Sequence, residues 1–166
     1  MGVFRSFQHG NDGEQFVIST LQTFGLEAVK NTDKETKYDH DIEAKIGSKK
    51  FTIEVKFDMY AVKSGNAAIE VHNVKQDKPS GLYCTKANLW AHIILDGDNK
   101  TFWLASVNKL KEFCQTTEPF RTIDAGGDKN AKLLLYKCDI ILPQVFHRFE
   151  TLEAEKAKKL IKELLK

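Results

Sequence analysis

Residues 38–58 place charged side chains at alternate positions, in a pattern that could do chemistry. Asp39 and Asp41 alternate with neutral residues in the first half, and Glu54 and Lys56 alternate with apolar ones in the second. Side chains two apart on a strand share a face. Carboxylates gathered there repel one another, so they need a cation or a shifted pKa. Oxygen ligands without Cys or His favour Mg²⁺ or Mn²⁺.

Such an ion lowers the pKa of a bound water and neutralises charge that develops on phosphorus. A lysine two residues from a ligand, about 7 Å along the strand, can reach that water or the phosphate. The set therefore suits metal-assisted hydrolysis of phosphodiesters. The alternative is a solvated strand face, and a single Glu-x-Lys is far more often that.

Two strands must present these side chains. The alternation predicts strands over residues 38–46 and 51–58, joined by a turn that contains Gly47 and Ser48. A helix is expected to follow the loose arm 1–11 and to end at Gly25. Glu14 heads its apolar stripe, either as a site residue or as a complement to the positive helix N-terminus.

The remaining pattern predicts further strands and helices around one sheet. We expect a short extended segment at 26–30, strands at 67–73, 92–95, 101–105, 120–124 and 133–138, and helices at 85–90, 106–115 and from 149 to the end; Pro143 is expected to end the last strand. The fold class is α/β, with a central mixed sheet flanked by helices in one domain over residues 1–166. Its core spans about 12–105, and a C-terminal extension carries the terminal helix at about 149–166.

Composition excludes several classes. The chain has 166 residues, a net charge of +2 and no apolar run near the ~20 residues that span a bilayer. Its three cysteines include no CxxC pair and its five histidines are scattered, which disfavours a zinc site and indicates free thiols in a reducing, cytoplasmic setting.

The order of these residues resembles the PD-(D/E)XK nuclease superfamily. Asp41 matches the aspartate of the first element, with His40 where Pro is frequent and Asp39 as a competing candidate. Glu54-Val55-Lys56 matches the (D/E)XK triplet. The resemblance implies a restriction-endonuclease-like αβββαβ core in a compact enzyme of prokaryotic, phage or archaeal type, similar to junction resolvases, homing endonucleases or phage nucleases.

The resemblance also implies roles. Asp41, Glu54 and the main-chain carbonyl of Val55 would hold Mg²⁺ or Mn²⁺, and Lys56 would serve the attacking water. Glu14, on the first helix, would bind a second metal or its waters.

Neighbouring acidic residues receive lesser roles. Glu70 could support Lys56 or a second metal, and Asp39 is expected to pair with a loop lysine rather than a metal. Asp58 is interpreted as a surface residue. Trp90 and Trp103 are expected in the core.

The expected activity is Mg²⁺-dependent hydrolysis of DNA, most simply by an endonuclease acting as a homodimer or higher oligomer, because cutting two strands takes two sites. The alternative is a non-catalytic nucleic-acid-binding or assembly module that retains the fold. Weaker candidates for DNA contact are Lys63, Ser64, Asn66, Lys75, Lys78, Ser80, Tyr83 and Lys86.

Overall fold

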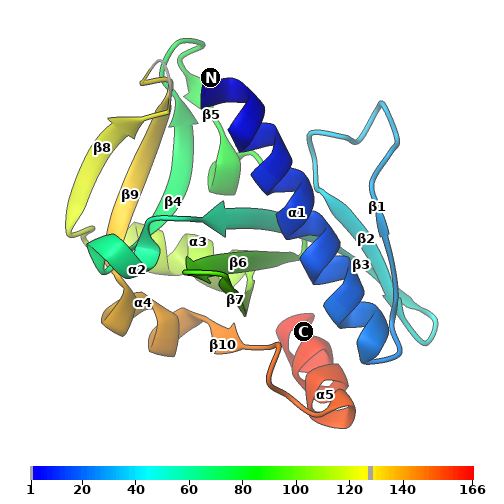
Figure 1. The fold of residues 1–166 in the computed structure, drawn as a ribbon. Helices are drawn as coiled ribbons and strands as arrows, with labels where there is room; N and C mark the ends of the chain where they lie inside the picture. The colour runs from blue at the N-terminus through cyan, green and yellow to red at the C-terminus, as the bar shows by residue number, and fades with distance from the viewer. Residues whose placement is uncertain (1, 127–128) are drawn as a thin grey trace.

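The computed structural model describes residues 2–126 and 129–166. Its strands form two sheets, a six-stranded sheet in the order β1-β2-β3-β6-β7-β10 and a four-stranded sheet in the order β5-β4-β9-β8 (Figure 1). The strands are β1 Glu27–Lys30, β2 Ile42–Ile46, β3 Lys49–Asp58, β4 Asn66–Asn73, β5 Lys78–Pro79, β6 Leu89–Asp96, β7 Asn99–Ser106, β8 Arg121–Ala125, β9 Ala131–Lys137 and β10 His147–Arg148. The helices are α1 Gly2–Thr23, α2 Ala61–Ser64, the 3₁₀ turn η1 Gly81–Tyr83, α3 Val107–Thr116, α4 Cys138–Val145 and α5 Ala154–Leu164.

The six-stranded sheet is mixed, as predicted. β1, β2 and β3 form an antiparallel meander, and β3 then pairs in parallel with β6. A parallel pair needs a long crossover, and here the crossover contains α2, β4, β5 and η1.

The alternation along β3 buries one of its faces in a hydrophobic core. Phe51 and Ile53 pack with Leu21 of α1 and Ile161 of α5 in the first core. The residues of β3 that alternate with these apolar ones point to the opposite face, toward the four-stranded sheet, because successive side chains of a strand alternate between its faces. The site residues Glu54 and Lys56 therefore face the layer between the two sheets.

The second core joins the sheets to each other. It contains Ile69 of β4, Trp90 of β6, Leu110 of α3 and Ile141 of α4, all fully or almost fully buried. Trp103 packs against this cluster with part of its ring exposed. The two tryptophans were both predicted in the core, and Trp90 is the more deeply buried.

Several predicted boundaries are wrong. The helix expected from about residue 12 begins at Gly2, and the strand expected from residue 38 begins at Ile42. The strand predicted at 67–73 exists, but it belongs to the second sheet, which was not predicted. A sequence pattern shows which face of a strand is apolar, and it does not show which sheet covers that face.

The helix predicted at 85–90 is absent. The amides of this segment donate outward instead, Lys86 N to Asp39 O at 2.9 Å and Asn88 N to Thr52 O at 3.1 Å. These tertiary bonds satisfy the backbone as a helix would have done, and β6 begins at Leu89.

Pro143 does not end a strand. β9 ends at Lys137, and Pro143 lies within α4, whose Ile141, Leu142 and Val145 are buried. The gain from burying that helix face outweighs the backbone hydrogen bond that proline cannot make.

None of the helices in the described ranges is long and apolar enough to cross a membrane. The three cysteines are free thiols, with Cys114 buried and Cys84 exposed.

Candidate active site

Asp41 is fixed at the end of the six-stranded sheet by three main-chain contacts. Its amide donates to Ile53 O at 3.0 Å, and its carbonyl accepts from Asn31 N at 2.7 Å. Its side-chain Oδ2 accepts from Val55 N at 2.8 Å. The amide of the triplet's central residue thus holds the Asp41 carboxylate directly beside the triplet.

Glu54 points into the same region, and its carboxylate lies close to that of Asp41. Burial, and then repulsion by Asp41, raise the pKa of Glu54 to about 8, although a hydrogen bond from Thr85 Oγ1 at 2.9 Å opposes the shift. Burial also raises the pKa of Asp41, against the Val55 amide that lowers it. Two half-buried carboxylates that repel each other make a site that favours a bound cation.

Neither Asp41 nor Glu54 forms an ion pair with a basic side chain of residues 11–126 or 129–166. Their oxygens are hard donors of the kind that Mg²⁺ and Mn²⁺ prefer. The residues present therefore fit such an ion.

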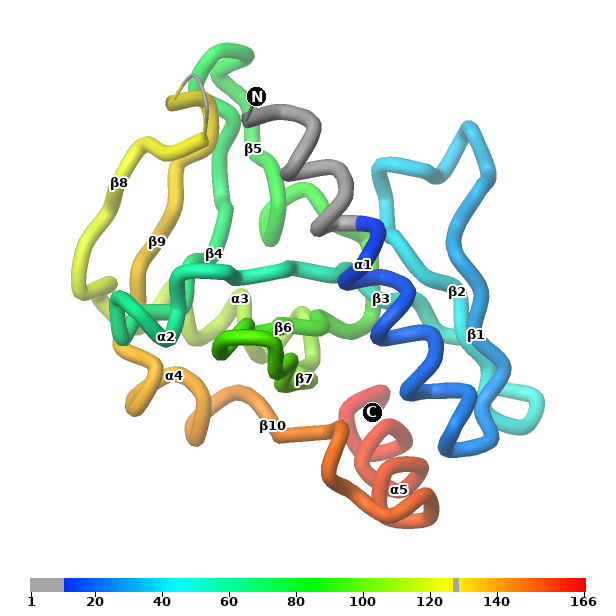
Figure 2. The backbone as a smooth tube through the Cα atoms, viewed as in Figure 1, coloured from blue at the N-terminus to red at the C-terminus, as the bar shows by residue number. Residues whose placement is uncertain are grey.

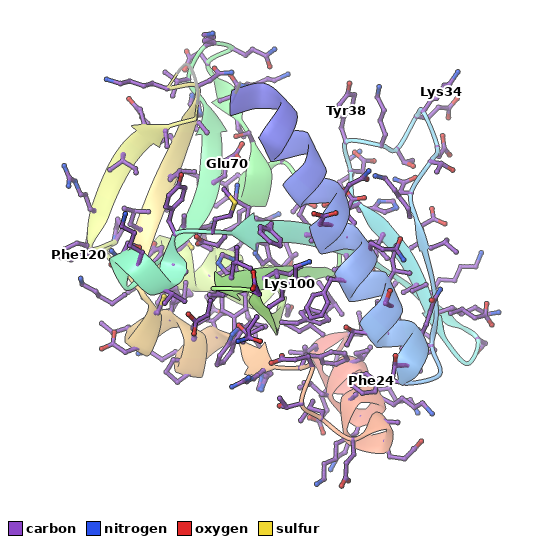
Figure 3. The ribbon with its side chains drawn as sticks, in the orientation of Figure 1. Phe24, Lys34, Tyr38, Glu70, Lys100 and Phe120 are labelled. Atoms are coloured by element: carbon purple, nitrogen blue, oxygen red, sulfur yellow. The ribbon has the colours of Figure 1, made fainter. Side chains whose placement is uncertain are left out.

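Lys56 lies next to this pair on the same face of β3 and is held by the second sheet. Its Nζ is 3.5 Å from Oε2 of Glu70 on β4, and both side chains are about 70% buried. Glu70 Oε1 accepts from Ser80 Oγ at 2.8 Å. Figure 3 labels Glu70 on β4. Of the two supporting roles expected for Glu70, the structure shows the contact with Lys56.

Gly81 keeps the segment after Ser80 tightly against β4. Its φ of +49° is in the left-handed region, and a Cβ there would collide with the carbonyl oxygen of Glu70. Only glycine combines this backbone conformation with such a close approach. The Ser80 hydroxyl is thereby fixed on Glu70.

Glu14, on α1, lies beside a lysine of β1. Its Oε2 is 2.6 Å from Lys30 Nζ, and the same ammonium is 2.6 Å from Oδ1 of Asn11. Glu14 is near enough to contribute to the raised pKa of Asp41. No group of three or more Asp, Glu, His or Cys side chains in the described ranges is arranged to hold a metal, and the second-metal role of Glu14 stays a prediction.

Two further aspartates have structural contacts. Asp39 Oδ2 is 3.0 Å from Lys86 Nζ, which is the loop-lysine pairing expected for it. The interpretation of Asp58 as a surface residue is wrong, because it is 5% exposed. It accepts hydrogen bonds from Tyr60 N and Ala68 N and lies 3.2 Å from Nε2 of the buried His92. These three partners, which no sequence pattern revealed, allow the Asp58 carboxylate to be buried.

A groove of about 530 Å³ opens from Glu54 between the two sheets. Its lining includes Tyr38 and Thr85 on one side and Gln76, Lys78 and Ser80 on the other. The loop between β1 and β2 and the turn between β4 and β5 both extend at the top of the view in Figure 2, and these loops supply Tyr38 and Gln76.

The residues suggested for DNA contact divide into groups. Lys78 and Ser80 line the groove, and Lys86 pairs with Asp39 beside it. The remaining candidates are outside its lining: Lys63, Ser64, Asn66, Lys75 and Tyr83.

Asn66 in particular has a local structural role. It is 8% exposed and exchanges hydrogen bonds with Ser64 in the turn that opens β4. The Asn66 amide groups and the Ser64 hydroxyl are engaged in this turn, whereas Asn66 Oδ1 is buried and accepts no hydrogen bond from the described residues. Their contact with DNA stays a prediction.

Sequence reasoning missed two residues that contact the site. Lys30 was treated only as part of a short extended segment. It lies two residues after the buried Ala28 and therefore on the same face of β1. Thr85 was interpreted as a helix cap, and its hydroxyl instead lies 2.9 Å from both Glu54 Oε2 and Asp39 O.

Comparison with known proteins finds no matching family model and no matching curated protein. Two solved structures are similar in architecture. A bacterial homing endonuclease, I-Ssp6803I, aligns with a TM-score of 0.47 and 13% identity over 61% of this chain and 68% of its own. The Holliday junction resolvase Hjc of the archaeal hyperthermophile Archaeoglobus fulgidus aligns with a TM-score of 0.45 and 13% identity over 90% of this chain and 95% of its own.

The fold and the candidate site together show what kind of domain the chain forms. The chain is a single α/β domain in which an antiparallel meander, extended by a parallel strand, presents two adjacent half-buried carboxylates and a lysine. This is the arrangement that the sequence motif predicted.

Proposed function

We propose that the protein is a metal-dependent nuclease that hydrolyses phosphodiester bonds in DNA. The observation that carries this proposal is the 2.8 Å hydrogen bond from Val55 N to Asp41 Oδ2. That bond ties the aspartate to the Glu54-Val55-Lys56 triplet, and Glu54 of that triplet lines the groove.

Each residue then has a role. Asp41, Glu54 and the Val55 carbonyl would hold Mg²⁺ or Mn²⁺, which when bound acidifies a water and neutralises charge on the phosphate. Lys56 orients the attacking water and donates hydrogen bonds to the phosphate oxygens. Glu70 and Ser80 keep Lys56 in place. Thr85 orients Glu54.

The substrate is proposed to lie in the groove, where Lys78 contributes positive charge and Tyr38 an exposed aromatic ring. Phosphate contacts by lysine position a nucleic acid, and an aromatic ring can stack on a base. We further propose that two copies act together when both strands of a duplex or a junction are cut.

Incubation with supercoiled plasmid and with a four-way junction, in Mg²⁺ or in EDTA, tests the activity. Cleavage is expected in Mg²⁺ only, and Lys56→Met should lose it. Glu27→Gln, which changes an exposed carboxylate on β1, is the matched control and should cut normally. Wild-type protein that binds these DNAs but cuts none of them, nor RNA, would instead establish the non-catalytic binding module.

The products refine the substrate class. Symmetric cuts in the junction alone would identify a junction resolvase. Cleavage at one site of a long duplex would identify a restriction or homing enzyme.

A further inference from the structure

The four carboxylates around the site differ in their charge partners. Glu14 is paired with Lys30 at 2.6 Å, and Glu70 is paired with Lys56 at 3.5 Å. Asp41 and Glu54, between them, have no such ion pair within the described residues. The two outer carboxylates therefore each have a lysine ion-pair partner, and the central two have none within the described residues.

The register of the sheet explains why Glu14 meets Lys30 and why Glu54 faces the other way. Lys30 pairs with Ile42, and Ile42 pairs with Ile53, so these three side chains share the face that α1 covers. Glu54 follows Ile53 and points to the opposite face. The ammonium of Lys30 thus meets Glu14 on the helix side of the sheet, while Glu54 faces the groove.

The contact between Glu14 and Lys30 is built rather than incidental. The side chain of Glu14 is 16% exposed, and its Oε2 is buried and accepts no hydrogen bond from the described residues. The Lys30 ammonium supplies the compensating charge and is also held by Asn11 at 2.6 Å. A cation therefore already occupies the carboxylate that the family resemblance assigns to a second metal.

We infer that the site takes a single divalent ion, held by Asp41 and Glu54, and that the Lys30 ammonium takes the place of a second one at Glu14. The charges agree, because the two unpaired carboxylates together match one divalent cation. Lys30 is then a positioning residue for Glu14 and a fixed positive charge beside Asp41. This inference deepens the proposed nuclease function and rests on it.

Counting Mn²⁺ ions tests the inference without any measurement of cleavage. Titration of the full chain, followed by the electron paramagnetic resonance of free Mn²⁺ and by calorimetry, should give one ion per chain for the wild type. Lys30→Met, which keeps the length of the side chain and removes its charge, should bind two. Adding Glu14→Gln to that variant should restore one, and Lys30→Arg should retain one.

The outcomes separate this inference from the proposed function. Two ions on the wild type, with one lost in Glu14→Gln, would overturn the inference and leave the nuclease proposal intact. One ion on Lys30→Met, with its circular dichroism and thermal unfolding unchanged, would overturn it also. Binding that survives in Glu54→Gln, or the absence of any Mn²⁺ binding, would overturn the proposed function and this inference together. If Lys30→Met does not fold, the wild-type and Glu14→Gln counts still decide.

Discussion

Replacing Glu54 by glutamine is expected to stabilise the metal-free protein at neutral and alkaline pH while abolishing cleavage. Burial and the neighbouring Asp41 raise the pKa of Glu54 from 4.5 to about 8. Glutamine has nearly the same shape, cannot be charged, and can still hydrogen-bond to Thr85, so the substitution removes the repulsion and keeps the packing.

The direction of the change in folding stability with pH follows from proton linkage. A carboxyl group with a higher pKa in the folded state favours folding below pH 4.5, and this contribution is lost as the pH rises through 8. At pH 8 the wild type therefore carries a penalty of roughly 4 kcal/mol relative to a group that stays neutral. Asp41 shares this penalty because the two carboxyl groups titrate as a pair.

Urea unfolding in EDTA at pH 4, 6 and 8 measures the effect. Glu54→Gln and wild type should have similar stability at pH 4, and the variant should be more stable by several kcal/mol at pH 8. Addition of Mg²⁺ at pH 8 should stabilise the wild type and leave the variant unchanged, because a ligand stabilises only the state that binds it. Glu27→Gln serves as the control, since Glu27 is an exposed strand carboxylate.

Equal stability of Glu54→Gln and wild type at pH 8 in EDTA would refute this reasoning. It would mean that ionising Glu54 costs no free energy in the folded state. A cation between Asp41 and Glu54 would then have no electrostatic basis.

Other substitutions test the parts around this pair. Lys56→Met should lower the cleavage rate at least ~100-fold by the scale of a lost transition-state contact, while Mn²⁺ binding measured by calorimetry persists; loss of binding as well would assign Lys56 to the metal. Glu70→Gln should lower kcat about 10-fold through a misplaced Lys56, with KM for a labelled oligonucleotide little changed; an unchanged kcat would remove Glu70 from the mechanism. Asp58→Asn should lower the free energy of unfolding by about 3 kcal/mol, because it breaks a buried pair with His92; urea titration at pH 7 checks this, and a change below ~1 kcal/mol would contradict it. Gly81→Ala should cost about 1–3 kcal/mol through strain at positive φ, and a thermal unfolding midpoint equal to that of the wild type would show that the close contact with Glu70 relaxes freely.

The sequence alone determined the chemical part of the site. Period-two alternation placed Glu54 and Lys56 on one face of a strand, and the residue types selected oxygen-donor metal chemistry. Asp41 could be added because a hairpin brings its end beside the triplet. Such local patterns survive folding because the geometry of a strand fixes them.

Only the tertiary structure decided what surrounds the central pair. The second sheet supplies Glu70 against Lys56, and the amides that bury Asp58 come from beyond β3. Alternation in β4 shows an apolar face, but it contains no information on which sheet the strand joins. The pairing of Glu14 with Lys30 likewise depends on how α1 packs beside the six-stranded sheet (Figure 1). Contacts between elements far apart in sequence follow from packing. Packing gave the two outer carboxylates lysine partners, and it gave the central two hydrogen-bond donors from Val55 and Thr85.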